Sequence, residues 1–123
     1  MSSTFVWVDI PVRDLDRAIA FYSAVLGSAV KKEIGTGFTF GLFSHSGADV
    51  AGCLYVAGPE NEPSLTGALV YLNVDGRLGP AVAAVTHAGG KVLQAEHQIG
   101  PHGWRAIVVD SEGNRLALHS PTG

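Results

Sequence analysis

Residues 5–27 read FVWVDIPVRDLDRAIAFYSAVLG, and the hydrophobic period changes once within this stretch. Residues 5–12 alternate in polarity and size, as expected for a strand with two distinct faces. The apolar residues that follow recur at helical spacing and form one stripe. Asp14 can accept hydrogen bonds from the free N–H groups at the helix start, and Gly27 suits the left-handed conformation that ends many helices. The stretch therefore predicts a strand, a tight turn and a helix over residues 14–26.

The same order of elements recurs after a polar linker, residues 58–64 (GPENEPS), which is the one break in composition along the chain. Residues 68–74 predict a strand, and residues 77–88 predict a second helix that ends at Gly89. The two halves align at an offset of 62 residues, which pairs Gly27 with Gly89. This offset indicates an internal repeat.

Each half also contains three further predicted strands after its helix. These six strands cover residues 29–33, 38–43, 50–56, 91–95, 104–109 and 116–119. We therefore predict an α+β fold of two βαβββ modules, residues 1–57 and 65–123, within a single domain. Side by side, the modules would form a curved eight-stranded sheet with both helices on its convex face. The concave face would then be the natural ligand cleft.

Composition narrows the class of protein. A chain of 123 residues suits one domain, and its net charge of −3 without a basic cluster argues against nucleic acid as a partner. The single cysteine, Cys53, excludes an intrachain disulfide and fits a reducing cytoplasm. The start shows no signal-peptide pattern, and no apolar run reaches the roughly 18 residues of a membrane span. We expect a cytoplasmic protein that does not bind membranes.

Two motifs carry a resemblance to a known family. Residues 12–27 follow the pattern V-x-D-L-x-R-A-x-x-F-Y-x-x-V-L-G, and residues 110–119 read DSEGNRLALH. Both are similar to motifs of the vicinal oxygen chelate superfamily, which includes glyoxalase I, bleomycin-resistance proteins and extradiol dioxygenases. The resemblance implies the fold and a homodimer, whose halves the linker would allow to exchange. It does not fix the function, because the superfamily hosts lyases, dioxygenases, epimerases and binding proteins.

The resemblance also locates the superfamily's metal positions. In its metal enzymes, four cleft positions carry His, Gln or Glu, which hold a divalent ion that polarises substrate oxygens. The flanking motifs and the repeat place these positions at Trp7, Gly52 or Cys53, Leu69 and Ala117. None of these side chains is a good ligand for a hard metal ion. We therefore predict that the protein uses no metal or other cofactor.

Strand alternation sorts the remaining residues into two faces. Val6, Val8 and Ile10 are expected to pack against the first helix. The alternate residues of the same strand then face the cleft. Asp9 is one of them, and an ion pair with Arg115 across the sheet is expected. The residues predicted to bind a ligand are Trp7, Phe40, Leu69, Tyr71, Asn73, Arg105 and Ala117.

Two functions compete at this stage. The first is a metal-independent protein that binds a small, partly apolar molecule. The second is a lyase or isomerase acting on a small carbonyl compound, with His119 or His102 as acid or base. His119 could instead bond a nearby backbone group, and His102 could be an exposed turn residue. A third hypothesis is a displaced metal site built from His102, His119 and Asp9.

Overall fold

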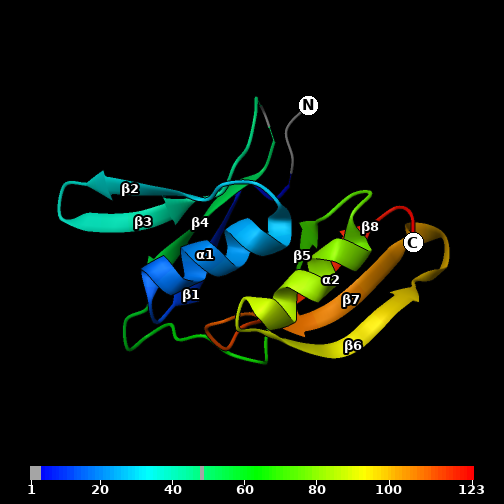
Figure 1. The fold of residues 1–123 in the computed structure, drawn as a ribbon. Coiled ribbons are helices and arrows are strands. Elements are labelled where there is room, and N and C mark those ends of the chain that lie inside the picture. The colour runs from blue at the N-terminus through cyan, green and yellow to red at the C-terminus, as the bar shows by residue number, and fades with distance from the viewer. Residues whose placement is uncertain (1–3, 48) are drawn as a thin grey trace.

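The computed structural model of the protein describes residues 4–47 and 49–123 and contains two helices and eight strands (Figure 1). Residues 1–3 and 48, which belong to the first predicted module, lie outside the described residues. The first module comprises β1 (Trp7–Val12), α1 (Leu15–Leu26), β2 (Lys31–Gly35), β3 (Phe38–Leu42) and β4 (Ala51–Val56). The second comprises β5 (Val70–Asn73), α2 (Leu78–His87), β6 (Lys91–Gln98), the 3-10 turn η1 (Gly100–His102), β7 (Trp104–Val109) and β8 (Arg115–Ser120). The predicted pair of βαβββ modules is confirmed.

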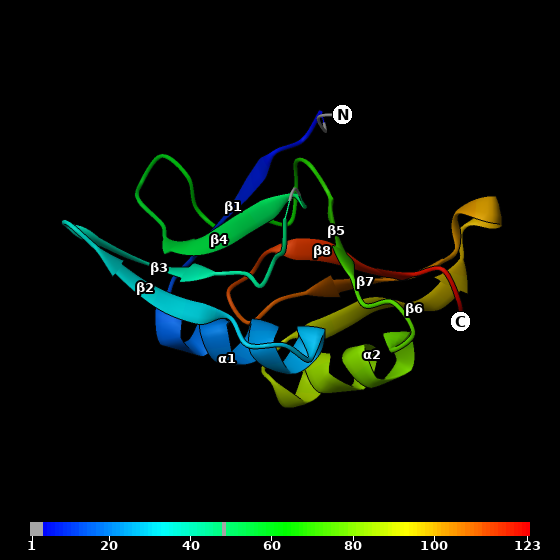
Figure 2. The ribbon, with the colours of Figure 1, turned by 90° about the horizontal axis from the view of Figure 1, so that it is seen from above.

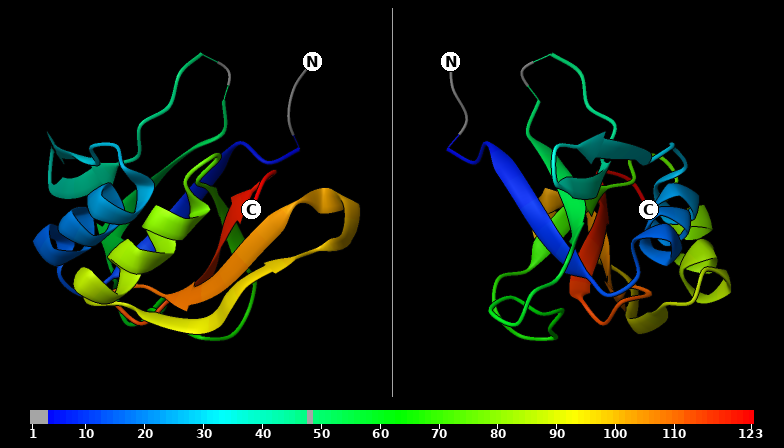
Figure 3. Two further views of the ribbon diagram at one scale, coloured as in Figure 1. Left: turned by 45° about the vertical axis from the view of Figure 1, so that its right-hand side comes forward. Right: turned by 90° about the vertical axis from the view of Figure 1, so that its left-hand side faces the viewer.

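The strands form two sheets of four, in the orders β1-β4-β3-β2 and β5-β8-β7-β6. In each sheet the first strand runs parallel to its neighbour, and the other pairs are antiparallel. Figures 2 and 3 show α1 and α2 next to each other on the same side of both sheets. Among the described residues no hydrogen-bonded ladder joins β1 to β5, so the expected eight-stranded sheet is two adjacent sheets. The repeat predicts the elements that each module contains, but carries no signal for pairing between the modules.

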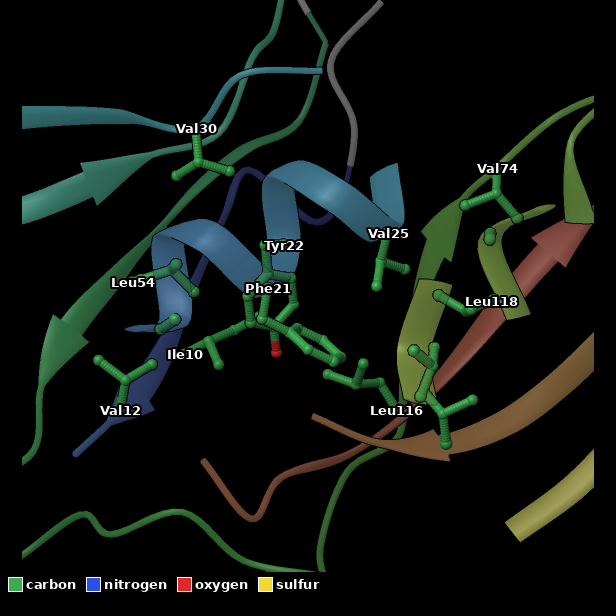
Figure 4. Close-up of a cluster of buried hydrophobic side chains, with 14 of the residues drawn as sticks. Ile10, Val12, Phe21, Tyr22, Val25, Val30, Leu54, Val74, Leu116 and Leu118 are labelled. Carbon is green, nitrogen blue, oxygen red and sulfur yellow. The ribbon is translucent and has the colours of Figure 1, made fainter. Parts of the chain in front are cut away.

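A single hydrophobic cluster joins the two modules (Figure 4). Phe21, Tyr22 and Val25 of α1 are fully buried in it, as are Leu116 and Leu118 of β8. Burial of each such side chain stabilises the fold by roughly 1.5–3 kcal/mol. The apolar stripe of α1 therefore packs against strands of both modules.

The predicted boundaries of α1 are confirmed at both ends. Asp14 precedes the helix, and its Oδ1 accepts a hydrogen bond of 3.0 Å from the Arg17 N–H. Gly27 ends the helix with a φ of 71°, a left-handed conformation that favours glycine. By contrast, the residue that precedes α2, Arg77, makes no side-chain capping bond.

The turn between β7 and β8 forms the first link between the modules. Asp110 is 3% exposed, and its Oδ1 accepts the N–H groups of Glu112, Gly113 and Asn114 at 2.8–2.9 Å. Its Oδ2 also accepts a hydrogen bond from the Tyr22 hydroxyl, which comes from α1. One carboxylate therefore closes the turn and attaches it to the other module.

Glu112 forms the second link, at the start of α1. Its carboxylate accepts hydrogen bonds from the backbone N–H groups of Arg13 (2.9 Å) and Asp14 (2.8 Å) and from Nε of Arg17 (2.7 Å). Burial would raise the pKa of Glu112, but the hydrogen bonds from Arg17, Ser111 and the two backbone groups outweigh it and lower the pKa to about 2. Glu112 is therefore ionised at neutral pH, where its charge complements the helix dipole.

Arg77 forms the third link, at the other end of α1. Its Nη1 donates to the carbonyl of Val25 at 2.6 Å, and its guanidinium lies against Gly27. A cation at the C-terminal end of a helix complements the dipole there. Module two therefore holds α1 at both ends, with a negative side chain at the start and a positive one at the end.

Three local predictions are corrected. Val6 precedes β1 and is 71% exposed, so it does not cover α1. β2 begins at Lys31 because Val30 still packs in the core and its N–H donates to Ser23 Oγ at 3.0 Å. β6 extends to Gln98, three residues past the predicted end, because it continues to pair with β7 across register shifts. Neither helix is long and apolar enough to span a membrane within the described part of the chain.

Candidate functional site

The face of the first sheet turned away from the helices carries a cavity. Parallel pairing of β1 with β4 sets Asp9 opposite Cys53, and antiparallel pairing of β3 with β4 sets Phe40 opposite Tyr55. These side chains therefore share one face. The cavity has a volume of about 530 Å³ and is lined by Trp7, Asp9, Phe38, Thr39, Phe40, Cys53, Tyr55 and Val56.

Four of the eight residues that line the cavity are aromatic. Phe38 and Phe40 stack with a centroid distance of 5.6 Å and an interplanar angle of 21°. Phe38 is 60% exposed and Trp7 is 47% exposed, so their ring surfaces remain open to solvent. The Tyr55 hydroxyl accepts a hydrogen bond from the Asn61 side chain, which orients the ring at the cavity edge. This arrangement offers flat apolar surfaces to a small ligand.

Asp9 is the charged residue of the cavity. Its Oδ1 accepts a hydrogen bond of 2.6 Å from Trp7 Nε1 and one of 3.3 Å from the Cys53 thiol. None of the described residues donates a hydrogen bond to its Oδ2. The expected ion pair with Arg115 does not form, because Arg115 lies on β8 in the other sheet, opposite Val109. Alternation predicted the face of Asp9 correctly but could not predict which sheet supplies its partners.

Cys53 is protonated in this environment. Burial raises the pKa of the Cys53 thiol to about 11, and the Asp9 carboxylate raises it further by accepting a hydrogen bond from the thiol and by its negative charge. A neutral thiol is a poor nucleophile and a poor metal ligand. The cavity therefore supports binding by stacking and hydrogen bonds better than covalent chemistry at Cys53.

The corresponding face of the second sheet is basic. Arg105 donates through Nη1 to the Tyr71 hydroxyl and through Nε to His97 Nε2 at 3.0 Å. The rings of Tyr71 and His119 meet edge to face, with centroids 6.3 Å apart. Both acceptors of Arg105 are neutral groups, so its positive charge is not compensated by them.

The two candidate catalytic histidines make a contact with each other through the backbone. His119 Nε2 lies 2.6 Å from the carbonyl oxygen of His102, to which a protonated Nε2 donates. Gly103 permits this approach, since its φ is 101° and a Cβ there would lie 3.1 Å from His119 Nε2. The His102 side chain is exposed on η1. The bond leaves only Nδ1 of His119 for acid–base chemistry.

The predicted ligand-binding residues do not all line one cavity. Trp7 and Phe40 line the cavity of module one, whereas Tyr71 and Asn73 line a second cavity of about 450 Å³ between the sheets. The Asn73 side chain is engaged locally, because its Oδ1 accepts the Asp75 N–H at 2.8 Å. Leu69, Arg105 and the fully buried Ala117 line neither cavity.

Of the residues predicted to bind a ligand, Trp7 and Phe40 line this cavity. The prediction did not include Phe38, Tyr55 or Cys53, which also line it. Phe38 has the parity of Phe40 in the sequence, so alternation alone could have included it. Tyr55 and Cys53 required the register between β3 and β4, which the sequence does not give.

The four positions implied for a metal ion do not fit one. Trp7 offers an indole, Cys53 a protonated thiol, and Leu69 and Ala117 aliphatic groups. In the described ranges, no group of three or more His, Cys, Asp and Glu side chains could hold a metal ion. The residues of the displaced site are also divided, with His102 and His119 in module two and Asp9 bonded to Trp7 in module one.

The fold and the cavity together define a class of α+β protein, in which two βαβββ modules place their helices on one side and present open sheet faces on the other. Residues 4–118 match the family model described as the Glyoxalase/Bleomycin resistance protein/Dioxygenase superfamily. The chain belongs to this superfamily.

Relatives and solved structures agree with this assignment. The putative glyoxylase CFP32 of Mycobacterium tuberculosis is 29% identical over 125 aligned residues, which cover 98% of this chain and 45% of the relative. The chain thus spans about half the length of the curated relatives it matches. A glyoxalase/bleomycin resistance protein/dioxygenase family enzyme from Burkholderia phytofirmans PsJN superimposes with a TM-score of 0.71 at 20% identity, covering 93% of this chain and 95% of that one. A glyoxalase/bleomycin resistance protein from Albidiferax ferrireducens T118 also gives 0.71 at 20% identity, covering 96% and 98%. These structures share the fold.

Proposed function

We propose that this protein binds a small, partly apolar molecule in the cavity of module one, without a metal ion. The observation that carries the proposal is the open aromatic wall formed by Trp7, Phe38 and Phe40 around a cavity of about 530 Å³. Pockets for small molecules typically measure roughly 300–1,000 Å³ and are lined by apolar and aromatic groups with a few polar ones. Here Asp9 supplies the polar group.

The absence of suitable ligands at the implied metal positions supports binding without metal. Trp7 stands at the first of these positions and bonds Asp9 through its indole N–H. In this arrangement the ligand stacks on the indole face instead of coordinating a metal ion through its oxygens. Ring stacking contributes about 0.5–1.5 kcal/mol beyond the burial of apolar area.

The lyase or isomerase alternative has less support. Such a reaction requires His119 or His102 to reach a substrate proton. His119 is tied to the His102 carbonyl, and neither imidazole lines either cavity described above. Binding therefore ranks ahead of catalysis.

We also propose that the protein is a cytoplasmic homodimer. Phe5 and Val6 are 74% and 71% exposed and continue the strand direction of β1 beyond the sheet. The open faces of the two modules differ in charge, one with Asp9 and one with Arg105. A second copy could cover both faces and bring Tyr71, Asn73, Arg105 and Leu69 toward the aromatic cavity. Analytical ultracentrifugation at micromolar concentration tests this directly, and a monomer would exclude it.

The binding proposal is tested with the neutral probe benzyl alcohol. The chain has two tryptophans, so a Trp104→Phe variant reports on Trp7 alone and a Trp7→Phe variant reports on Trp104 alone. We expect benzyl alcohol to quench or shift the Trp7 emission with or without EDTA, and to leave the Trp104 emission unchanged. A response that requires a divalent ion would contradict metal-free binding.

A further inference from the structure

The cavity of module one combines aromatic walls with one uncompensated carboxylate. We propose that it selects a small organic cation, an alkylated ammonium group, with Asp9 as its counter-ion. This inference rests on the proposed binding function and adds the charge class of the ligand. It follows from three features of the cavity: the bonding of Asp9, the rings around it and the charges nearby.

The bonding of Asp9 leaves its charge free to act on a ligand. Its Oδ1 is held by two neutral donors, the Trp7 indole and the Cys53 thiol. The ion pairs formed among the described residues join Arg13 to Glu62, Arg17 to Glu112 and Lys32 to Asp16, and none includes Asp9. The carboxylate is thus oriented by two bonds, while Oδ2 has no protein donor in the described structure.

The rings around Asp9 favour a cation for a separate reason. The face of an aromatic ring carries partial negative charge, and it attracts a cation that lies within about 6 Å of the ring centre. Trp7 provides the ring type that binds cations best, and Phe38, Phe40 and Tyr55 provide further faces. Alkylated ammonium groups suit such cages because their carbon surface is apolar while their charge is positive.

The electrostatic surroundings point the same way. Burial raises the pKa of Tyr55, and the Asp9 and Glu60 carboxylates raise it further, which indicates a negative potential at the cavity edge. Lys31 of β2 is a cation on this face. It pairs with Leu42 of β3, which pairs with Cys53 of β4, which in turn pairs with Asp9 of β1. The backbones of Lys31 and Asp9 lie three strand spacings of about 4.8 Å apart, and no ion pair among the described residues joins their side chains. Glu33 lies beside Lys31 on the same face of β2.

The same features discriminate against other charges. An anion would meet the Asp9 carboxylate, whereas the basic face with Arg105 lies in the other module. A neutral ligand of the same shape would gain the apolar contacts but would cover the Asp9 carboxylate without pairing it. Covering an unpaired charge is costly. The cavity should therefore rank ligands of one shape in the order cation, neutral molecule, anion.

Three probes of nearly equal shape test this ranking: choline, which is cationic, 3,3-dimethyl-1-butanol, which is neutral, and 3,3-dimethylbutanoate, which is anionic. Binding is measured through Trp7 emission in the Trp104→Phe protein. We expect choline to bind about tenfold more tightly than 3,3-dimethyl-1-butanol, since tenfold corresponds to about 1.4 kcal/mol, within the range of cation–π contacts. We expect 3,3-dimethylbutanoate to bind least.

Two matched variants assign the preference to Asp9. Asp9→Asn keeps an oxygen that can accept from Trp7 but removes the charge, and we expect it to abolish the preference for choline. Asp16→Asn removes an exposed carboxylate that pairs with Lys32 outside the cavity, and we expect it to keep the preference. Because the comparison of the three probes uses unchanged Asp9, it stands even where Asp9→Asn lowers stability.

The outcomes separate the two proposals. If 3,3-dimethyl-1-butanol and benzyl alcohol shift the Trp7 emission as readily as choline does, the preference for a cation is wrong and the binding function stands. If choline is preferred equally by Asp9→Asn, the assignment to Asp9 is wrong. If none of the probes changes the Trp7 emission, both proposals fail.

Discussion

α1 and α2 occupy equivalent places in the two modules, but their ends are held differently. Glu112 and Arg77 of module two contact the start and the end of α1, and Asp14 caps it from its own module. α2 begins without a side-chain cap at Arg77. The two halves therefore share the order of their elements, whereas side chains of module two hold both ends of the helix of module one.

The open faces of the modules differ as well. Module one presents aromatic rings and Asp9, whereas module two presents Arg105, His97 and Tyr71. The repeated backbone therefore carries two different chemistries. Three substitutions test whether the contacts between the modules stabilise the fold, and one tests whether the open aromatic face binds a ligand. They are given from the largest expected effect to the smallest.

Asp110→Ala should have the largest effect. It removes the acceptor of three backbone N–H groups and of the Tyr22 hydroxyl in a buried position. Because buried donors then lack partners, we expect a loss of about 3 kcal/mol or more in the free energy of unfolding, measured with urea. Asp75→Ala in an exposed turn is the control, with a change within about 0.5 kcal/mol. Equal effects would show that the turn does not link the modules.

Glu112→Gln should lower the free energy of unfolding by about 2 kcal/mol. It replaces a charged carboxylate, which accepts hydrogen bonds from Arg17 and from two backbone N–H groups, with a neutral amide. The folded pKa of about 2 lies below the ordinary value of 4.5, so the stabilising contribution is complete above pH 4.5 and is lost as the pH falls toward 2. We expect the difference between the wild type and the variant to shrink over this window. Glu62→Gln, which affects an exposed pair with Arg13, should change stability by less than about 1 kcal/mol.

Trp7→Ala tests the open face. A core aromatic costs about 3–5 kcal/mol when it is truncated to alanine, but Trp7 is 47% exposed. We expect a loss of under about 2 kcal/mol by thermal unfolding, together with loss of benzyl alcohol binding measured by isothermal titration calorimetry. A loss of the full core value would mean that Trp7 is packing rather than a ligand surface.

Arg77→Met should have the smallest effect, about 1 kcal/mol, because it removes one hydrogen bond and a favourable charge at the end of α1. The expected readout is faster hydrogen exchange of amides in the last turn of α1, with no change in α2. Faster exchange in both helices to the same degree would contradict a specific contact with α1.

The sequence predicts the local parts of this fold well. Asp14, Gly27 and the Asp110 turn act on their own neighbours, and these short-range roles are legible from residue type and spacing. The contacts of Glu112 with Arg13 and Arg17 span about a hundred residues, and no local pattern predicts them. Nor does any local pattern predict that β1 and β5 belong to separate sheets in the described structure.

The candidate site was predictable to a similar extent. Alternation placed Trp7 and Asp9 on the open face, because it depends only on strand parity. The partner of Asp9 was predicted wrongly as Arg115, since parity does not say which sheet a strand joins. The contact with Cys53 follows from the parallel register of β1 and β4, which is a tertiary feature. Whether Leu69 and Ala117 meet a ligand remains a prediction.

The most direct test of the account observes the two indole N–H resonances by ¹H–¹⁵N NMR during a titration with choline. Trp7 Nε1 donates to Asp9 inside the cavity, whereas Trp104 lies on β7 in the other module, and a Trp7→Phe variant assigns the two peaks. We predict that the Trp7 resonance shifts in a saturable manner while the Trp104 resonance stays in place, and that EDTA changes neither. An unchanged Trp7 resonance at saturating choline, or equal shifts of both resonances, would contradict it.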